Sequence, residues 1–182
     1  MSHPEQLNFV KAVRNQHPNN FKNCNVLEVG SLNINGSVRS LFKNCNYLGI
    51  DVGPGIGVDL VCEGQKYNGP DRMYDTTISC ECFEHNPYWL ETFFNMWRMT
   101  KLGGLVIVTC ATIGRGEHGT KRTTPQDSPL TIEFGWEDYY KNLTEQDFIT
   151  PLNFGYLFEQ YSFQTNNQSH DLYFVGIKNT KL

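Results

Sequence analysis

The sequence has no long apolar run, no block of like charge, no low-complexity tract and no internal repeat. No stretch approaches the length of a membrane span, and residues 1–10 lack the apolar core of a signal peptide. Basic residues are not in excess either, since the formal net charge is −4 and the sequence pI is about 5.7. We therefore expect no membrane attachment and no broad nucleic-acid surface, because such surfaces are usually basic. The one basic cluster is Arg115, Lys121 and Arg122.

The chain also lacks any Cys-x-x-Cys pair, although it contains six cysteines. Four of the six lie in or beside apolar, strand-like segments, which favours reduced thiols buried as small hydrophobic side chains. Reduced thiols are typical of the cytoplasm, so we expect a cytoplasmic protein. With 182 residues, of which 39% are hydrophobic and 13% aromatic, the chain fits a single packed domain.

Apolar strands alternate with amphipathic helices along the chain, which is typical of an α/β fold. The pattern predicts helices over 4–15, 37–43 and 87–100, the last capped by Gly103-Gly104, and a further helix capped by Thr144. It predicts strands over 25–30, 47–51, 58–62, 74–79 and 105–110, and a hairpin of 156–163 and 172–178 around Asn166-Asn167. The expected architecture is a doubly wound, mainly parallel, seven-stranded sheet with a terminal antiparallel hairpin.

Three successive strands end on residues suited to a nucleoside. Gly30 allows a tight turn after the first strand, and the carboxylate of Asp51 ends the second, where it can accept both hydroxyls of a ribose. Glu63 follows the third strand and could accept from an adenine amino group. The dinucleotide fingerprint is broken, because positions 32 and 35 are Leu and Asn instead of Gly. These residues indicate an adenosine pocket without a pyrophosphate cradle.

Five ordered motifs carry a resemblance to a known family: Val26-Leu-Glu-Val-Gly30, Tyr47-Leu-Gly-Ile-Asp51, Gly57-Val-Asp-Leu-Val-Cys-Glu-Gly64, Tyr74-Asp-Thr-Thr-Ile-Ser-Cys-Glu-Cys-Phe-Glu-His85 and Met99-Thr-Lys-Leu-Gly-Gly-Leu105. In order and spacing they resemble class I S-adenosylmethionine-dependent methyltransferases, especially the broad group that includes ubiquinone-biosynthesis O-methyltransferases. The resemblance implies a Rossmann-like fold, a transferase activity and S-adenosylmethionine as the cofactor. It covers roughly residues 24–110 and is weaker beyond them.

The resemblance also implies a role for each matched residue. Gly30 and Ser31 would lie against the methionine part of the cofactor, with Glu28 supporting their loop. Asp51 would hold the ribose, and the adenine would meet Val52 on its face and Glu63 at its edge. The backbone of Cys80, at the end of the fourth strand, would lie near the methionine amino group.

The segment Glu81-x-x-Glu84-His85 follows the fourth strand and resembles the metal site of small-RNA 3′-end 2′-O-methyltransferases and ubiquinone-pathway O-methyltransferases. That resemblance implies a divalent cation, Mg²⁺ or Mn²⁺, held by Glu81, Glu84 and His85, with His118 as a fourth ligand. In the alternative interpretation these residues only shape the cofactor pocket. His85 or His118 would then serve as the general base, because imidazole titrates near neutral pH.

We interpret 1–182 as one methyltransferase domain: an N-terminal helix (1–23), a cofactor-binding core (24–110), a lid or acceptor region (111–145), and a C-terminal helix and hairpin (146–182). The acidic charge and the lack of a recognition domain favour O-methylation of a small hydroxylated acceptor, a sugar or metabolite. Two alternatives remain open. One is a metal-assisted methyltransferase of RNA or another nucleic acid, and the other is a non-catalytic S-adenosylmethionine-binding partner.

Overall fold

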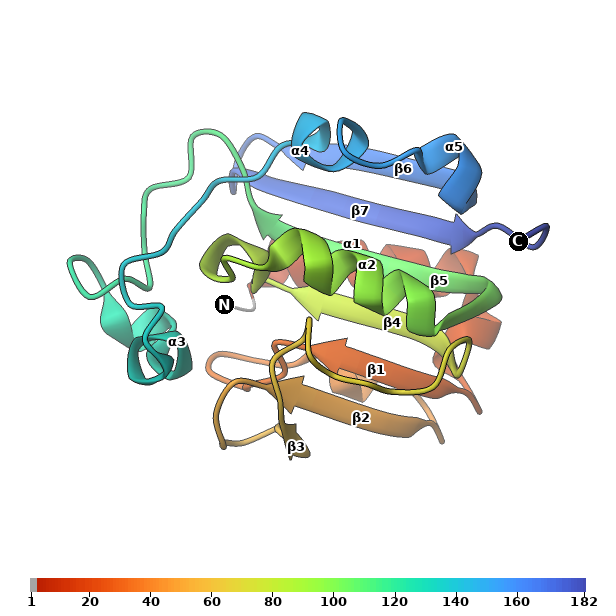
Figure 1. Cartoon of the computed structure of the whole chain (residues 1–182), viewed down its shortest axis with the longest axis horizontal. Coiled ribbons are helices and arrows are strands. Elements are labelled where there is room, and N and C mark those ends of the chain that lie inside the picture. The colour runs from red at the N-terminus through yellow and green to blue at the C-terminus, as the bar shows by residue number, and fades with distance from the viewer. Residues whose placement is uncertain (1–2) are drawn as a thin grey trace.

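A computed structural model describes residues 3–182 and contains one seven-stranded sheet of order β3-β2-β1-β4-β5-β7-β6 (Figure 1). Strands β1 to β5 run parallel to one another, whereas β7 is antiparallel to both β5 and β6. The strands are β1 (Asn25–Val29), β2 (Asn46–Asp51), β3 (Leu60–Val61), β4 (Tyr74–Cys80), β5 (Thr100–Ala111), β6 (Phe158–Asn166) and β7 (Asp171–Lys178). The doubly wound, Rossmann-like architecture expected from the sequence is thereby confirmed.

Helices cover both faces of the sheet, with α1 (Pro4–Gln16) behind it and α2 (Trp89–Met99) in front in Figure 1. The alternation of apolar side chains along β5 explains this arrangement. Leu105 and Ile107 belong to the core under α1, while Val106 and Val108 belong to the core under α2. The second core also takes side chains from two short helices, α4 (Glu145–Ile149) and α5 (Phe154–Leu157). Among residues 3–182, no helix is long and apolar enough to cross a membrane.

Several local predictions are correct. The N-terminal helix forms, and Thr144 caps α4 through a capping box. The Thr144 hydroxyl accepts a hydrogen bond from the Asp147 N–H, and the Asp147 carboxylate accepts one from the Thr144 N–H. The hairpin also forms, although its turn runs over 167–170. There the Asn166 side-chain oxygen accepts from the backbone N–H groups of Gln168 and Ser169.

Other local predictions are wrong. Gly103-Gly104 does not cap α2: the helix ends at Met99, the Thr100 N–H donates to the carbonyl groups of the last turn, and β5 begins at once. Gly103, at φ +73°, instead lies near an irregularity in the β4–β5 pairing. The predicted strand 58–62 shrinks to Leu60–Val61, and the predicted helix 37–43 is a 3₁₀ turn, Val38–Leu41.

The chain between β5 and α4 is not a plain loop. It contains a 3₁₀ turn, Pro125–Asp127, and the short helix α3 (Pro129–Phe134), which lies beyond the carboxyl ends of the parallel strands (Figure 1). The segment returns to the sheet where the Leu143 N–H donates to the Ala111 carbonyl over 2.9 Å. Residues 112–142, called the lid segment below, therefore leave and rejoin the sheet at one place.

Candidate active site

A cavity with about 890 Å³ of empty space, part of it open to solvent, lies at the carboxyl ends of β1, β2 and β4. This is the edge at which parallel α/β sheets bind ligands. Of the residues predicted to meet the cofactor, six line it: Glu28, Gly30, Ser31, Asp51, Val52 and Cys80. The structure therefore brings together side chains from three strands that the sequence motifs had assigned to one site.

The turn after β1 forms the floor of the cavity. Gly30 has φ +79°, and a Cβ atom at this position would lie 2.5 Å from the Cβ of Cys82, so only glycine fits. The N–H groups of Gly30 and Ser31 both donate to the carbonyl of Ile50, which joins the turn to the end of β2. The hydroxyl of Ser31 is buried and has no hydrogen-bond partner among residues 3–182, so it remains available to a ligand.

Asp51 is fixed by the backbone on both sides. One carboxylate oxygen accepts from the Leu32 N–H over 2.9 Å, and the other accepts from the Val52 N–H over 2.8 Å. Burial raises the pKa of Asp51, while the two N–H donors act in the opposite direction. Each oxygen keeps a further lone pair, so the carboxylate can still accept hydroxyl groups from the cavity.

Leu32 replaces the usual second glycine of the first motif, and its side chain reaches across to the loop after β2. A Cβ atom on Gly55 would lie 2.2 Å from the Cδ1 atom of Leu32, so the Leu32 side chain packs directly on the backbone of Gly55. Leu32 itself lines the cavity. The departure from the motif therefore alters the wall of the cavity without filling it.

Glu63 follows β3 as expected, but its largely buried side chain already has partners within the protein. Its carboxylate pairs with Lys66 over 2.6 Å and accepts from the Gln65 amide over 2.7 Å. The neighbouring Cys62 and Gly64 line the cavity. A contact between Glu63 and an adenine edge stays a prediction.

The lid segment supplies a wall that the sequence motifs did not identify. Asp127, Ser128, Leu130 and Trp136 line the cavity. Leu130 also packs on the loop after β2, since a Cβ atom on Gly53 would lie 2.8 Å from its Cδ2 atom. The length and polarity of the loop had suggested a lid, but no periodic pattern indicated which of its residues face the cavity.

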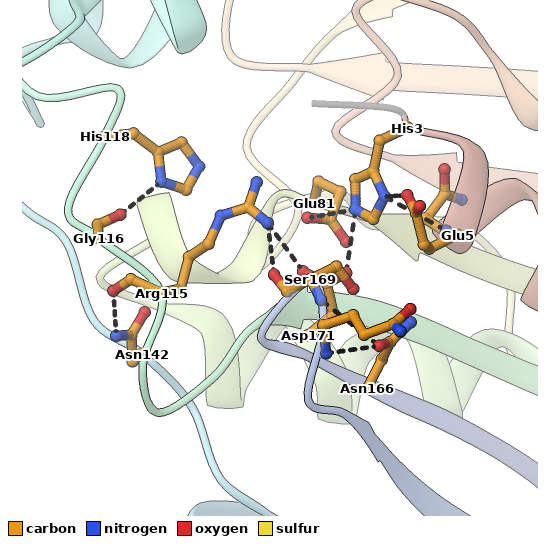
Figure 2. A network of polar contacts seen from close by, with 12 residues as sticks. His3, Glu5, Glu81, Arg115, Gly116, His118, Asn142, Asn166, Ser169 and Asp171 are labelled. Carbon is orange, nitrogen blue, oxygen red and sulfur yellow. Dashed lines mark hydrogen bonds and ion pairs between the residues drawn. The ribbon is translucent and has the colours of Figure 1, made fainter.

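Glu81 lies at a strained position directly after β4, with φ +51°. Its carboxylate faces His3, whose Nε2 atom is 3.6 Å from Glu81 and 3.1 Å from Asp171 (Figure 2). Hydrogen bonds to Asp171 and Glu81 raise the pKa of His3 to about 10, so the imidazole is a cation between two buried carboxylates. Arg115 approaches Asp171 from the lid segment at 3.4 Å. Glu81 thus belongs to an ion-pair network that ties the N-terminus to the sheet.

Glu84, His85 and His118 form a second cluster, in which one potential ligand atom from each residue lies within 4.8 Å of the others. Glu84 and His85 are buried, and the Nε2 atom of the partly exposed His118 is shielded from solvent. Both Glu84 oxygens, both His85 nitrogens and His118 Nε2 lack hydrogen-bond partners within the described part of the chain. Burying polar atoms without a hydrogen-bond partner costs folding free energy unless a ligand or an ion binds them.

The protonation of this cluster follows from its surroundings. Burial and the nearby Glu81 carboxylate raise the pKa of Glu84 to about 8. Burial and His118 lower the pKa of His85 well below its usual range, and burial also lowers the pKa of His118. Both imidazoles are consequently neutral near pH 7, so they can accept a proton or donate a lone pair.

The lid segment orients His118. Its Nδ1 atom lies 3.1 Å from the Gly116 carbonyl, which cannot donate, so Nδ1 carries the proton and Nε2 keeps its lone pair toward the cluster (Figure 2). The Tyr140 hydroxyl donates to the same carbonyl over 3.3 Å, and its ring packs against both His85 and His118. One carboxyl group and two neutral imidazoles constitute a donor set that fits a divalent metal ion, and Glu84 would release its proton when the ion binds.

Comparison with known proteins identifies the fold. No protein-family model and no curated protein sequence matches the chain. Among solved structures, it is similar to the 1,6-didemethyltoxoflavin N1-methyltransferase of Burkholderia thailandensis, which was solved with its substrate and S-adenosylhomocysteine (TM-score 0.63, 12% identity, covering 96% of this chain and 78% of that one). A Bacillus halodurans protein described as a methyltransferase superimposes over 97% of this chain and 100% of its own (TM-score 0.65, 10% identity).

A third similar structure is a Methanococcus maripaludis protein described as an S-adenosylmethionine-dependent methyltransferase. Its TM-score is 0.61 at 12% identity, and the match covers 96% of this chain and 85% of that one. The chain therefore has the fold of the class I S-adenosylmethionine-dependent methyltransferases, which confirms the fold implied by the sequence motifs.

Proposed function

We propose that this protein is an S-adenosylmethionine-dependent methyltransferase that methylates an oxygen atom of a small hydroxylated acceptor. The observation that carries the proposal is the cavity itself: Gly30, Ser31 and Asp51 converge there from two strand ends. S-adenosylmethionine would supply a methyl group activated on a sulfonium. The carboxylate of Asp51 would accept the ribose hydroxyls, and the uncommitted Ser31 hydroxyl would meet the amino-acid end of the cofactor.

Two neighbouring imidazoles, one of which lines the cavity, suit an oxygen acceptor. A hydroxyl must lose a proton as it is methylated, and the neutral His85, which lines the cavity, can take it. His118 lies beside His85, with a centroid-to-centroid distance of 4.9 Å between the two rings, and can serve in the same way. The lid segment would exclude water from the acceptor and align it.

Ion pairs within the basic cluster of the lid segment favour a small acceptor over RNA. Arg122 pairs with Glu117 over 2.7 Å and approaches Asp138, while Arg115 donates to the Ser169 carbonyl and lies next to Asp171. Guanidinium groups held by the protein's own acids are poorly available to phosphates.

Calorimetric titration with S-adenosylhomocysteine tests the cofactor site. We expect binding by the parent protein, and we expect Asp51→Asn to weaken it about 10- to 100-fold through loss of a charged acceptor. Asp138→Asn, at an exposed position of the lid segment, is the matched control and should bind like the parent. Absence of binding by the parent would refute the proposal. Binding without turnover of S-adenosylmethionine on any hydroxylated acceptor would instead indicate a non-catalytic binding partner.

In an alternative arrangement of the same site, we propose that Glu84, His85 and His118 hold a divalent cation beside the acceptor, in which case the imidazole lone pairs bind the ion and do not accept the proton. Their uncommitted, solvent-shielded donor atoms support this proposal. The ion would supply a Lewis acid that lowers the pKa of an acceptor hydroxyl. Glu81, the fourth predicted ligand, already pairs with His3, so it would join the ion only by leaving that network.

Titration with Mn²⁺ in the absence of any acceptor tests the cation site directly. Glu84→Gln and His118→Gln should each weaken Mn²⁺ binding at least about tenfold, since each removes a ligand. His170→Gln, at a histidine outside the cluster, serves as the control and should leave the affinity unchanged. Equal Mn²⁺ affinity in all four proteins would contradict the cation site while leaving the cofactor site intact.

A further inference from the structure

Cys24 and Cys45 lie side by side at the amino ends of β1 and β2, on the opposite edge of the sheet from the cavity. Their sulfur atoms are 3.1 Å apart. The two residues occupy matching register positions, because the parallel bridge Lys22↔Lys43 precedes them and the pair Asn25↔Asn46 follows them. The Asn46 N–H donates to the Cys24 carbonyl over 2.9 Å and continues the ladder between these pairs.

This register suits a covalent bond between the two sulfurs. Neighbouring strands lie about 4.8 Å apart, which falls inside the Cα–Cα separation of about 4.4–6.8 Å that disulfides tolerate. Among residues 3–182, each thiol makes one further, weak hydrogen bond: Cys24 Sγ donates to the Asn20 carbonyl and Cys45 Sγ to the Lys43 carbonyl, each over 3.3 Å. Little is therefore lost when both S–H groups disappear.

We propose that Cys24 and Cys45 form a reversible intrachain disulfide by exchange with a low-molecular-weight disulfide such as oxidised glutathione. Cys45 is partly exposed and reacts first: its thiolate attacks a glutathione sulfur, and one glutathione leaves as the thiol. Cys24 then attacks the sulfur of Cys45 and releases the second glutathione. The two cysteines lose two electrons and two protons, and one glutathione disulfide becomes two glutathione molecules.

Burial explains the order of these steps. Cys24 is only 7% exposed, and burial raises the pKa of its thiol to about 12, so it reacts slowly with bulky reagents. Once Cys45 carries a mixed disulfide, however, its sulfur lies next to Cys24, and the second step is intramolecular. Cys45 is thus the entry point and Cys24 the resolving thiol.

The bond would close the chain from residue 24 to residue 45, a loop that contains β1 and the Gly30–Ser31 turn at the floor of the cavity. Cross-linking restricts the unfolded chain more than the folded one. For a loop of this length we expect the melting temperature to rise by about 5–10 °C on oxidation and to fall back on treatment with dithiothreitol. Formation of this disulfide does not require the proposed methyltransferase activity.

Mass spectrometry of the full-length protein treated with oxidised glutathione tests the site. Trypsin should release peptide 23–39, which holds Cys24, linked to peptide 44–66, which holds Cys45. Because 44–66 also contains Cys62, the digest is repeated on Cys62→Ser, in which the link should persist, and on Cys45→Ser, in which it should vanish together with the thermal shift. A stable glutathione adduct on Cys45 without a cross-link would overturn the proposal, as would a cross-link through Cys62.

Discussion

Glu28 offers a quantitative test of how burial at the base of the cavity controls stability. The side chain is 5% exposed, and the Tyr47 hydroxyl donates to one of its oxygens over 2.8 Å. Burial raises the pKa of Glu28 to about 8 from its ordinary value of 4.5, and the Tyr47 hydrogen bond offsets only part of the increase. The folded protein therefore keeps this carboxyl protonated at pH values where an unfolded chain has released the proton.

The sign of the effect on stability follows from this difference. Below about pH 4.5 the carboxyl is protonated in both the folded and the unfolded state, and its contribution to the free energy of unfolding is fully present. This stabilising contribution decreases as the pH rises above about 4.5 and is lost once the pH has passed about 8. Between about pH 6 and pH 8, the loss amounts to roughly 2 kcal/mol. In a chain of this size that corresponds to a decrease of roughly 5–8 °C in melting temperature.

The substitution Glu28→Gln removes the titrating group but keeps an oxygen that can accept from Tyr47. We expect thermal unfolding, followed by circular dichroism without cofactor, to show a smaller decrease in melting temperature between these pH values in the variant than in the parent. Glu91→Gln, at an exposed position of α2, is the matched control and should retain the parent's pH dependence. An equally steep decrease in Glu28→Gln and the parent would refute the argument from burial.

Three further substitutions test other parts of the fold. Lys178→Met should destabilise the protein by about 2–4 kcal/mol in denaturant titrations, because the ammonium group donates to the carbonyls of Trp97, Arg98 and Thr100 where α2 ends. Phe93→Ala should cost about 3–5 kcal/mol, since this fully buried ring packs against four other phenylalanines. Gly119→Ala should weaken Mn²⁺ binding at least about tenfold, because its new Cβ would lie 2.6 Å from the His85 ring.

The sequence was informative wherever one local pattern determines the structure. Buried parallel strands need apolar side chains on both faces, so the run from Leu105 to Cys110 could be recognised without knowledge of its neighbours. The capping box at Thr144 is equally local. The end of α2 was misjudged because two glycines usually follow a helix, whereas here β4 pairs with Thr100 and draws the chain into β5 before the glycines are reached.

The cavity wall formed by the lid segment could not be predicted in the same way. Asp127 and Leu130 lie on a 3₁₀ turn and a short helix that contain no buried residue, and Ser128 joins the two elements, so no hydrophobic period marks the side that faces the cavity. Gln6 is also buried and lines the cavity from α1, far from every motif. Both contributions depend on long-range packing, which a local pattern does not encode.

The separation of Glu81 from Glu84 has a backbone cause. Glu81 has a left-handed backbone conformation at φ +51°, and after Cys82 the chain forms a 3₁₀ turn, Phe83–His85, so no regular helix continues from β4 through both acids. Glu81 consequently meets His3 from the N-terminus, while Glu84 joins His85 and the lid segment's His118. The His3 imidazolium neutralises one acid of the pair that the motif had placed together. The other acid, Glu84, lies beside two neutral imidazoles, and neither of its oxygens has a hydrogen-bond partner among residues 3–182. A cation bound there would offset the cost of burying this carboxyl group.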